Sequence, residues 1–168
     1  MKRSVMIFVA VLGIAMLAQG SARADGEENQ IRKLLDQYNA AIGAQDLNQI
    51  TSCYVADPSL VVFDVAPPPV INGANGLRRQ WKNAFQALPG KWRVRETNFE
   101  IERDGRLAVG YGVMQISIQD RKGNRGRQFS RRLTMSFRKR AGQWLITHSH
   151  TSVPVDLTGG RAAMGDSY

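Results

Sequence analysis

Four consecutive strand-like runs fill the second half of the chain, and they constrain the fold more than any other feature. The runs are Lys91–Glu102, Arg106–Gln119, Arg127–Lys139 and Gln143–Pro154. Asp104-Gly105 divides the first two runs and Ala141-Gly142 divides the last two. Short glycine-bearing dividers between such runs predict consecutive antiparallel hairpins. We therefore expect a long meandering sheet from residue 91 onward.

The third run shows which face of that sheet is buried. Phe129, Leu133, Met135 and Phe137 alternate with polar residues, and between Phe129 and Phe137 the only charged residue in this apolar phase is Arg131. Successive side chains of a strand point to opposite faces, so one face is predicted to be buried and the other wet or in contact with a partner.

The first half of the chain reads mainly as helix. Apolar residues at three- and four-residue spacing predict one helix from Glu27 to Gly43, with Tyr38 in its apolar stripe. Asp46 is the expected N-cap of a second, shorter helix. Residues 59–65 read as a strand, and a third helix, with Trp81 and Phe85 in its apolar stripe, ends at Pro89-Gly90. Helices followed by a meander predict an α+β fold in which the helices cover a curved, mostly antiparallel sheet.

The first 24 residues have the three-part pattern of a secretory signal peptide. Lys2 and Arg3 precede an apolar run, and Ala22-Arg23-Ala24 fits small-x-small cleavage. The run is too short to span a bilayer, so no stable membrane anchor is expected. Cleavage after Ala24 would lower the net charge from +9 to +6 and predicts a periplasmic or secreted protein. We assign residues 25–155 to one domain and 156–168 to a flexible tail.

The single cysteine excludes an intrachain disulfide, and the distribution of basic residues does not indicate a nucleic-acid partner. Cys53 cannot form an intrachain disulfide, and its apolar neighbours predict that it is buried. Basic residues gather between Arg121 and Arg140, but the chain has a predicted export signal, and no nucleic-acid motif or interleaved aromatic residue that we expect to be exposed accompanies them. We therefore expect no nucleic-acid partner; an acidic ligand, an anionic envelope surface or plain solvation suits this charge better.

The order of these elements, together with the run RRLTMSFRKRAGQWLITHSHTSVP (131–154), resembles the SnoaL-like proteins. These are relatives of ketosteroid isomerase in the nuclear transport factor 2-like superfamily, and the resemblance spans about residues 27–155. It implies a cone-shaped α+β fold with three N-terminal helices, a homodimer formed through the sheet, and a hydrophobic pocket in the cone. It does not imply one activity, because the superfamily contains enzymes and binding modules.

Comparison with the isomerase branch transfers its catalytic positions only in part. Tyr38 matches the tyrosine donor of the first helix. Val62 falls at the position of the carboxylate base, and Asp64 lies two residues further, on the same strand face. Leu133 falls at the position of the acid donor and cannot donate. Loss of one oxyanion donor costs about 100- to 1000-fold in rate, so steroid isomerisation is not expected here.

His148 and His150 are the only histidines, and their i, i+2 spacing places both on one face of a strand. Three roles are open for them: a metal site with Asp64, an acid–base pair, or hydrogen-bonded groups at a polar pocket rim. Trp144 and Ile146 precede them at the same phase. We therefore predict that this face, with at least one imidazole, points into the pocket.

The combined hypothesis is a pocket for a small apolar or weakly acidic ligand, with no cofactor and no metal. Candidate catalytic residues are Asp64, His148, His150 and Tyr38. Candidate ligand-binding residues are Val62, Trp81, Phe85, Phe129, Arg131, Met135 and Trp144. In an enzyme, Asp64 or a histidine would be the general base, and Tyr38 with Arg131 would stabilise an oxyanion in an isomerase, cyclase or dehydratase reaction. The alternatives are a binding module without turnover and a dimeric interaction module.

Overall fold

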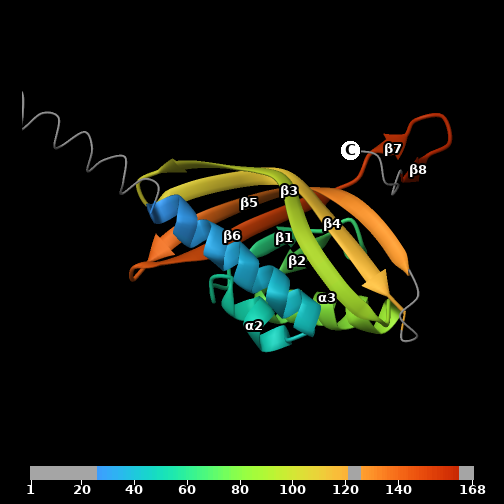
Figure 1. The fold of residues 1–168 in the computed structure, drawn as a ribbon, viewed down its shortest axis with the longest axis horizontal. Coiled ribbons are helices and arrows are strands. Elements are labelled where there is room, and N and C mark those ends of the chain that lie inside the picture. The colour runs from blue at the N-terminus through green and yellow to red at the C-terminus, as the bar shows by residue number, and fades with distance from the viewer. Residues whose placement is uncertain (1–25, 121–125, 163–168) are drawn as a thin grey trace, which may run out of the picture.

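The computed structural model describes residues 26–120 and 126–162. The predicted signal peptide and its cleavage site lie outside the described residues, as do Arg121, Lys122, Arg125 and the last six residues of the tail. A long sheet arches over the helices, and the first helix (residues 26–44, blue) crosses beneath it (Figure 1). Within the described part, no helix is long and apolar enough to span a bilayer.

The helices form where the apolar stripes predicted them. In the first helix, Ile31, Leu35, Tyr38 and Ile42 are buried against the sheet. The helix α2 (Leu47–Ser52) begins at Asp46, whose carboxylate accepts hydrogen bonds from the N–H groups of Asn48 (2.9 Å) and Gln49 (3.0 Å). This confirms the predicted N-cap, which satisfies two amides that an α-helix leaves free.

The six-stranded sheet has the order β2-β1-β6-β5-β4-β3. Its members are β1 (Val61–Phe63), β2 (Val70–Asn72), β3 (Lys91–Asp104), β4 (Leu107–Gln119), β5 (Arg127–Arg140) and β6 (Gln143–Ser152). All neighbours pair antiparallel except β1 and β6, which are parallel. The predicted meander is confirmed, and the sheet is mixed because β1 returns beside the last long strand.

Two strands bend sharply at the middle of the sheet. The pairing of β3 with β4 shifts between Thr97 and Glu100, where Asn98 takes a positive φ of 51°. Gly112 of β4 lies opposite this irregularity, and a Cβ there would sit 2.9 Å from the Asn98 carbonyl oxygen. No side chain fits against backbone at that distance, so glycine permits the close approach that curves the sheet.

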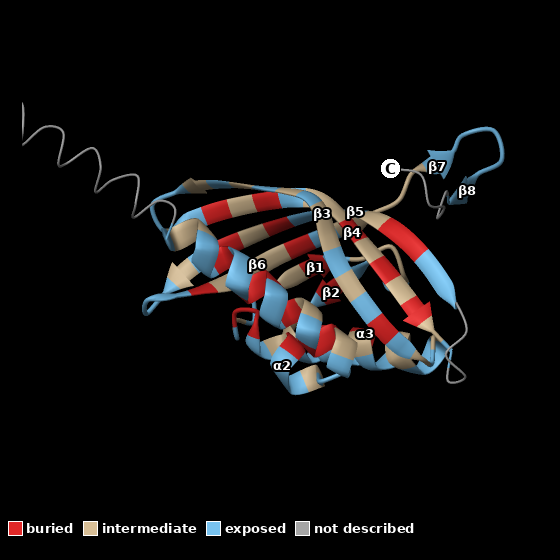
Figure 2. Ribbon diagram, viewed as in Figure 1, coloured by how far each residue is buried: buried red, intermediate tan, exposed pale blue. Residues whose placement is uncertain are grey.

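The core lies between the concave face of the sheet and the helices. Buried residues alternate along the strands and form one stripe on the first helix (Figure 2). Ile116, Leu133, Met135, Phe137 and Ile146 are almost fully enclosed. Cys53 is buried, as predicted, and burial raises the pKa of its thiol to about 11, which keeps it protonated and unreactive.

Two segments differ from the expected organisation. β2 was not predicted, because Pro67-Pro68-Pro69 and two Asn-Gly pairs around it are typical of loops; the helix α3 (Gly73–Ala87) begins inside that turn-like sequence. In the sequence, β1 and β2 separate α2 from α3, but the two helices contact each other below the sheet (Figure 1). Within the predicted tail, β7 (Val155–Asp156) and β8 (Arg161–Ala162) form a short hairpin that projects from the body (Figure 1).

Candidate functional site

Along β6, the last strand of the six-stranded sheet, the alternation of inward- and outward-facing side chains shifts by one residue before His148. Ser136 of β5 pairs with His148, but the next residue, Phe137, pairs with Ile146, so Thr147 is an extra residue without a partner. Such a β-bulge exchanges the faces of the strand. Trp144 and Ile146 are buried, and beyond the bulge Ser149 is buried in their place. The prediction that His148 or His150 points into the pocket is therefore wrong.

The two imidazoles lie on the outer face of the sheet, on either side of Phe63. The ring centroid of Phe63 lies 5.0 Å from that of His148 and 5.6 Å from that of His150, with both pairs edge-on. His148 Nδ1 lies 2.7 Å from the carbonyl oxygen of Val61, which can only accept, so this nitrogen carries the hydrogen. Across residues 26–120 and 126–162, no group of three or more His, Cys, Asp or Glu residues is placed to hold a metal ion.

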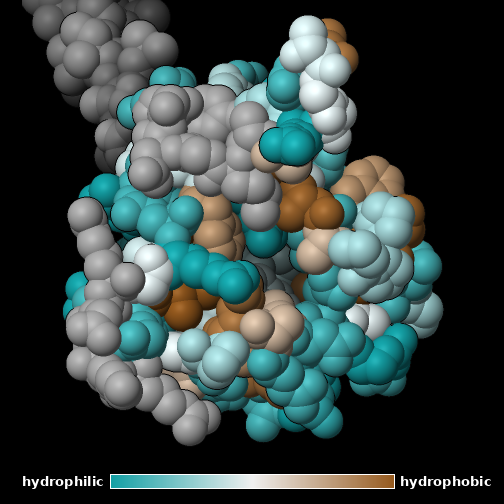
Figure 3. Space-filling model, turned by 90° about the vertical axis from the view of Figure 1, so that its right-hand side faces the viewer, coloured by the Kyte–Doolittle hydropathy of each residue, from teal (hydrophilic) through white to brown (hydrophobic). Residues whose placement is uncertain are grey.

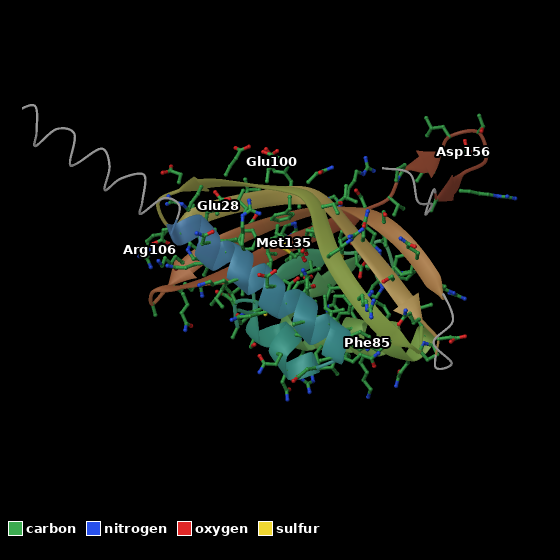
Figure 4. All side chains as sticks on the ribbon, in the orientation of Figure 1. Glu28, Phe85, Glu100, Arg106, Met135 and Asp156 are labelled. Carbon is green, nitrogen blue, oxygen red and sulfur yellow. The ribbon has the colours of Figure 1, made fainter. Side chains whose placement is uncertain are left out.

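A narrow cavity of about 60 Å³ lies beneath the sheet, between β1, the middle strands, the first helix and α3. Six of the predicted site residues line it: Tyr38, Val62, Asp64, Trp81, Arg131 and Met135. Met135 lies in the interior below the sheet, whereas Glu100 projects from the surface (Figure 4). The sequence therefore predicted cavity-lining residues on β1, on β5 and on two helices, but none of those on β6.

Three other predicted ligand-binding residues stand behind the cavity wall or away from it. Phe85 packs edge-on against Trp92, with ring centroids 5.2 Å apart, and supports the wall from outside. Phe129 lies under the guanidinium group of Arg131, 5.3 Å from ring centroid to Cζ. Trp144 donates its indole N–H to Glu27 Oε2 at 2.8 Å, which ties the start of the first helix to the sheet.

The charged centre of the cavity is the ion pair between Asp64 and Arg131. Arg131 Nη1 lies 3.2 Å from Asp64 Oδ1, and both side chains are less than one-fifth exposed. Oδ1 also accepts from Thr151 Oγ1 (3.2 Å), and Oδ2 accepts from Gln80 Nε2 (3.1 Å). The structure thus pairs two of the candidate site residues directly. The carboxylate holds the guanidinium in place, which offsets part of the cost of burying two charges.

Arg131 keeps an unused donor in this setting. Its Nε is buried and has no hydrogen-bond partner within the described residues. Burial lowers the pKa of Arg131, and the neighbouring Asp64 opposes that shift, so the group remains a cation. Because an unpaired buried donor costs about 1–3 kcal/mol, it is a position where a ligand oxygen would be stabilised.

A chain of hydroxyl groups forms the other polar wall. Ser149 Oγ lies 3.0 Å from Tyr54 Oη, and Tyr54 donates to Tyr38 Oη at 3.2 Å. Burial raises the pKa of Tyr54 to about 12 and raises that of Tyr38 well above its usual value, so both remain neutral donors at physiological pH. With Tyr38 accepting from Tyr54, its own hydrogen has no acceptor among the described residues and is available to a ligand.

The cavity thus combines two unused donors, on Arg131 and Tyr38, with an apolar lining. Oxygen acceptors such as a carbonyl, an enolate or a carboxylate suit such a pair of donors. Tyr54, Gln80, Ser149 and Thr151 line the cavity but were not predicted as site residues. Tyr54 lies just beyond the end of α2, where its apolar neighbours could have indicated burial. Ser149 and Thr151 carried no signal, because they alternate with residues that are equally polar.

A second buried polar pair joins the first helix to β3. Asn39 Nδ2 donates to Glu96 Oε2 at 2.5 Å, while Asn39 Oδ1 and Glu96 Oε1 are buried without partners in the described part of the chain. Burial raises the pKa of Glu96, and the hydrogen bond from Asn39 only partly offsets this. A protonated Glu96 supplies the donor that Asn39 Oδ1 lacks, so the protonated acid is the form that suits this site.

This pair predicts an unusual dependence of stability on pH. The pKa of Glu96 is higher in the folded than in the unfolded chain, so its stabilising effect is complete below the unfolded value and is lost as pH rises through the folded value. Glu96→Gln, an amide analogue of the protonated acid, should remove that loss. Urea unfolding from about pH 4 to about pH 8 measures it, with the exposed Glu100→Gln as control. Parallel profiles for wild type and Glu96→Gln would contradict the prediction.

Comparison with known proteins agrees with this architecture. The family model of the SnoaL-like domain matches residues 31–156, and the chain belongs to this family. Among curated proteins, no relative matches the sequence.

Solved structures with the same fold share little sequence with the chain. An NTF2-like protein of unknown function from Pseudomonas putida is 21% identical, with a TM-score of 0.75 over 86% of this chain and 98% of its own. A putative calcium/calmodulin-dependent protein kinase II association domain from Xanthomonas campestris is 24% identical, with a TM-score of 0.65 over 77% and 89%. An NTF2-like superfamily protein from Salmonella enterica is 15% identical, with a TM-score of 0.68 over 86% and 99%. The fold is therefore NTF2-like.

Proposed function

We propose that this protein binds a small, partly apolar molecule in the cavity below the sheet, through an oxygen atom that Arg131 and Tyr38 hold. The unpartnered, buried Nε of Arg131 is the observation that carries this proposal. The donor lies beside Asp64, whose hydrogen bonds to Arg131, Thr151 and Gln80 fix the position of the pair. The rest of the lining is largely apolar, which suits a hydrocarbon skeleton.

The size of the cavity limits what it can enclose. Ligand pockets usually measure about 300–1,000 Å³, whereas this cavity measures about 60 Å³. The cavity can therefore enclose only the ligand oxygen and the few atoms around it, and not the whole ligand. Trp81 lines the cavity and is partly exposed, so the remainder of the ligand would lie against it.

Acid–base chemistry without a cofactor is the catalytic form of this proposal. Asp64 Oδ2 accepts a single hydrogen bond among the described residues, from Gln80, and so has capacity to take a proton from a ligand carbon or oxygen. Tyr38 and Arg131 would then stabilise the negative charge that develops on the ligand oxygen. Isomerisation, cyclisation and dehydration all need this combination. His148 and His150 take no part, because they lie on the other face of the sheet.

Paired ligands test the proposal. Small ketones and carboxylic acids should bind, and their deoxygenated analogues should not, in titrations followed by NMR. Tyr38→Phe should weaken binding by about 3- to 10-fold, and Arg131→Lys, which keeps the charge but removes Nε, by about 10- to 100-fold. His150→Gln is the control and should leave binding unchanged. Equal binding of ligands with and without the oxygen would refute the proposal.

The outer face of the sheet favours a further role, homodimerisation. Phe63, Leu107 and Tyr111 are exposed there at 40%, 53% and 40%. Exposed apolar residues on a sheet face are typical of protein interfaces. We propose a dimer through this face. Tyr111→Asp should shift the mass measured by analytical ultracentrifugation from dimer to monomer, and a monomeric wild type would contradict the proposal.

We also propose that the protein is exported, on the basis of its N-terminal sequence. The pattern of Lys2, Arg3 and Ala22-Arg23-Ala24 supports removal of residues 1–24. Expression of the full chain in a bacterial host should give a periplasmic or secreted product whose N-terminal residue, read by mass spectrometry, is Asp25. A cytoplasmic product that retains Met1 would contradict this.

A further inference from the structure

A second, much larger hollow lies at the end of the sheet where β4 leads into β5. This groove measures about 670 Å³, within the range of ordinary ligand sites. Its walls come from the first helix around Asn39–Gly43, the start of β3, the end of β4 and the start of β5. Only Trp92 and Ile116 line both the groove and the cavity. Figure 3 views this end of the molecule, where hydrophilic side chains surround a hollow that contains hydrophobic residues.

The charge of the groove has one sign. Arg93, Arg95 and Arg127 line it, and none of its described lining residues is acidic. The ion pairs formed by the described residues use Arg32, Arg131, Lys139 and Arg140 instead. Arg93 and Arg95 therefore lie together beside a hollow whose described lining residues include no carboxylate, and an anion would relieve their mutual repulsion.

Neutral hydrogen-bonding groups are aligned with two of these arginines across the sheet. Arg93 pairs in register with Ser117, which in turn pairs with Gln128. Arg95 pairs with Gln115, and its Nε donates to Gln115 Oε1 at 2.8 Å, which orients the guanidinium group. Two residues apart on a strand, Arg93 and Arg95 point to the same side roughly 6.5 Å from each other. One row across the strands thus contains Arg93, Ser117 and Gln128, and the adjacent row contains Arg95 and Gln115. Each row combines one guanidinium group with amide or hydroxyl groups.

We propose that this groove is a second binding site, for a ligand that carries two neighbouring phosphate groups. A guanidinium group matches phosphate oxygens with a planar pair of donors, and the two rows supply one such group for each phosphate. Trp92 and Val94 alternate with Arg93 and Arg95 along β3 and so point to the opposite face of the sheet, which leaves the phosphate groups as the part of the ligand that the arginines recognise. The site does not depend on the ligand of the cavity, because Arg131 and Tyr38 do not line the groove.

Two probes separate a soluble ligand from a lipid head group. Inorganic pyrophosphate is titrated into the full chain by calorimetry, and vesicles of cardiolipin, which carries two phosphates, are tested by co-sedimentation against phosphatidylcholine vesicles. We expect Arg93→Gln/Arg95→Gln to weaken binding at least tenfold. The matched control is Arg79→Gln/Arg138→Gln, which removes the same charge from two exposed arginines that do not line the groove. Thermal melts verify that both variants fold.

Each outcome decides the proposal. Pyrophosphate binding that only the groove variant loses supports the site for a soluble diphosphate. Cardiolipin binding that only the groove variant loses, without pyrophosphate binding, supports the site for a lipid head group. Equal losses in both double variants would show that net charge alone attracts the probe, and this would overturn the proposal. Failure of both probes to bind the wild type would overturn it as well.

Discussion

Arg131→Leu is expected to destabilise the protein by about 3 kcal/mol, because it leaves the carboxylate of Asp64 buried without its cation. The ion pair is less than one-fifth exposed on either side, so solvent cannot replace the lost partner fully. Thr151 and Gln80 would still donate to Asp64, but neither carries a charge. Urea unfolding measures the change as a lower midpoint at an unchanged slope.

Two comparisons isolate the ion pair from its surroundings. Removal of both charges, in Asp64→Asn/Arg131→Leu, should return stability to within about 1 kcal/mol of the wild type, since a neutral pair carries no desolvation cost. Arg132→Leu changes the next residue, which is exposed on the outer face, and should cost less than about 0.5 kcal/mol. If Arg131→Leu is as stable as Arg132→Leu, the ion pair between Asp64 and Arg131 does not stabilise the fold, which contradicts the prediction.

Deletion of Thr147 is expected to prevent cooperative folding. Without the bulge, one part of β6 must exchange its faces. Either Trp144 and Ile146 move to the solvent, or Ser149 and Thr151 leave the cavity and two imidazoles enter it. Exposure of a tryptophan and an isoleucine alone costs about 3–6 kcal/mol, comparable with the whole stability of an ordinary domain. Circular dichroism should show no cooperative thermal transition.

Thr147→Ala is the matched control, because it keeps the length of β6. It removes only the hydrogen bond from Thr147 Oγ1 to the Ser136 carbonyl oxygen, which is 3.1 Å long. The expected cost is about 1 kcal/mol, with a cooperative transition retained. If the deletion variant melts like Thr147→Ala, the strand tolerates both phases and the bulge does not determine which side chains face the cavity.

The sequence predicted the strands of the meander and the charged centre of the cavity because both are local or periodic signals. Alternation from Phe129 to Phe137 identified Arg131 as the one charge on the buried face of that stretch, and Asp64 was a candidate base because it lies two residues beyond the position of the family's carboxylate. Asp46 was predicted as an N-cap from its position before a helical stripe. Each of these features depends on neighbours within a few residues.

The phase of β6 could not be predicted in the same way. His148 and His150 alternate with Ser149 and Thr151, so hydrophobicity does not distinguish the two faces there. The bulge at Thr147 is visible only in the pairing with β5, and β1 lies beside β6 through a long-range parallel contact. Simple alternation therefore predicted that the histidines continue the face of Trp144 and Ile146, whereas the bulge at Thr147 places them on the opposite face.

The central claim is that a ligand oxygen in the cavity accepts a hydrogen bond from Arg131, and the arginine side-chain NMR signal tests it most directly. In protein labelled with ¹⁵N, the Nε–H resonance of Arg131 is assigned by comparison with Arg131→Lys and followed during titration with a bound ketone or carboxylic acid. We expect this resonance to shift downfield and to become protected from exchange with water. Ligand binding that leaves it unchanged while perturbing His148 and His150 would place the site on the other face of the sheet and contradict the claim.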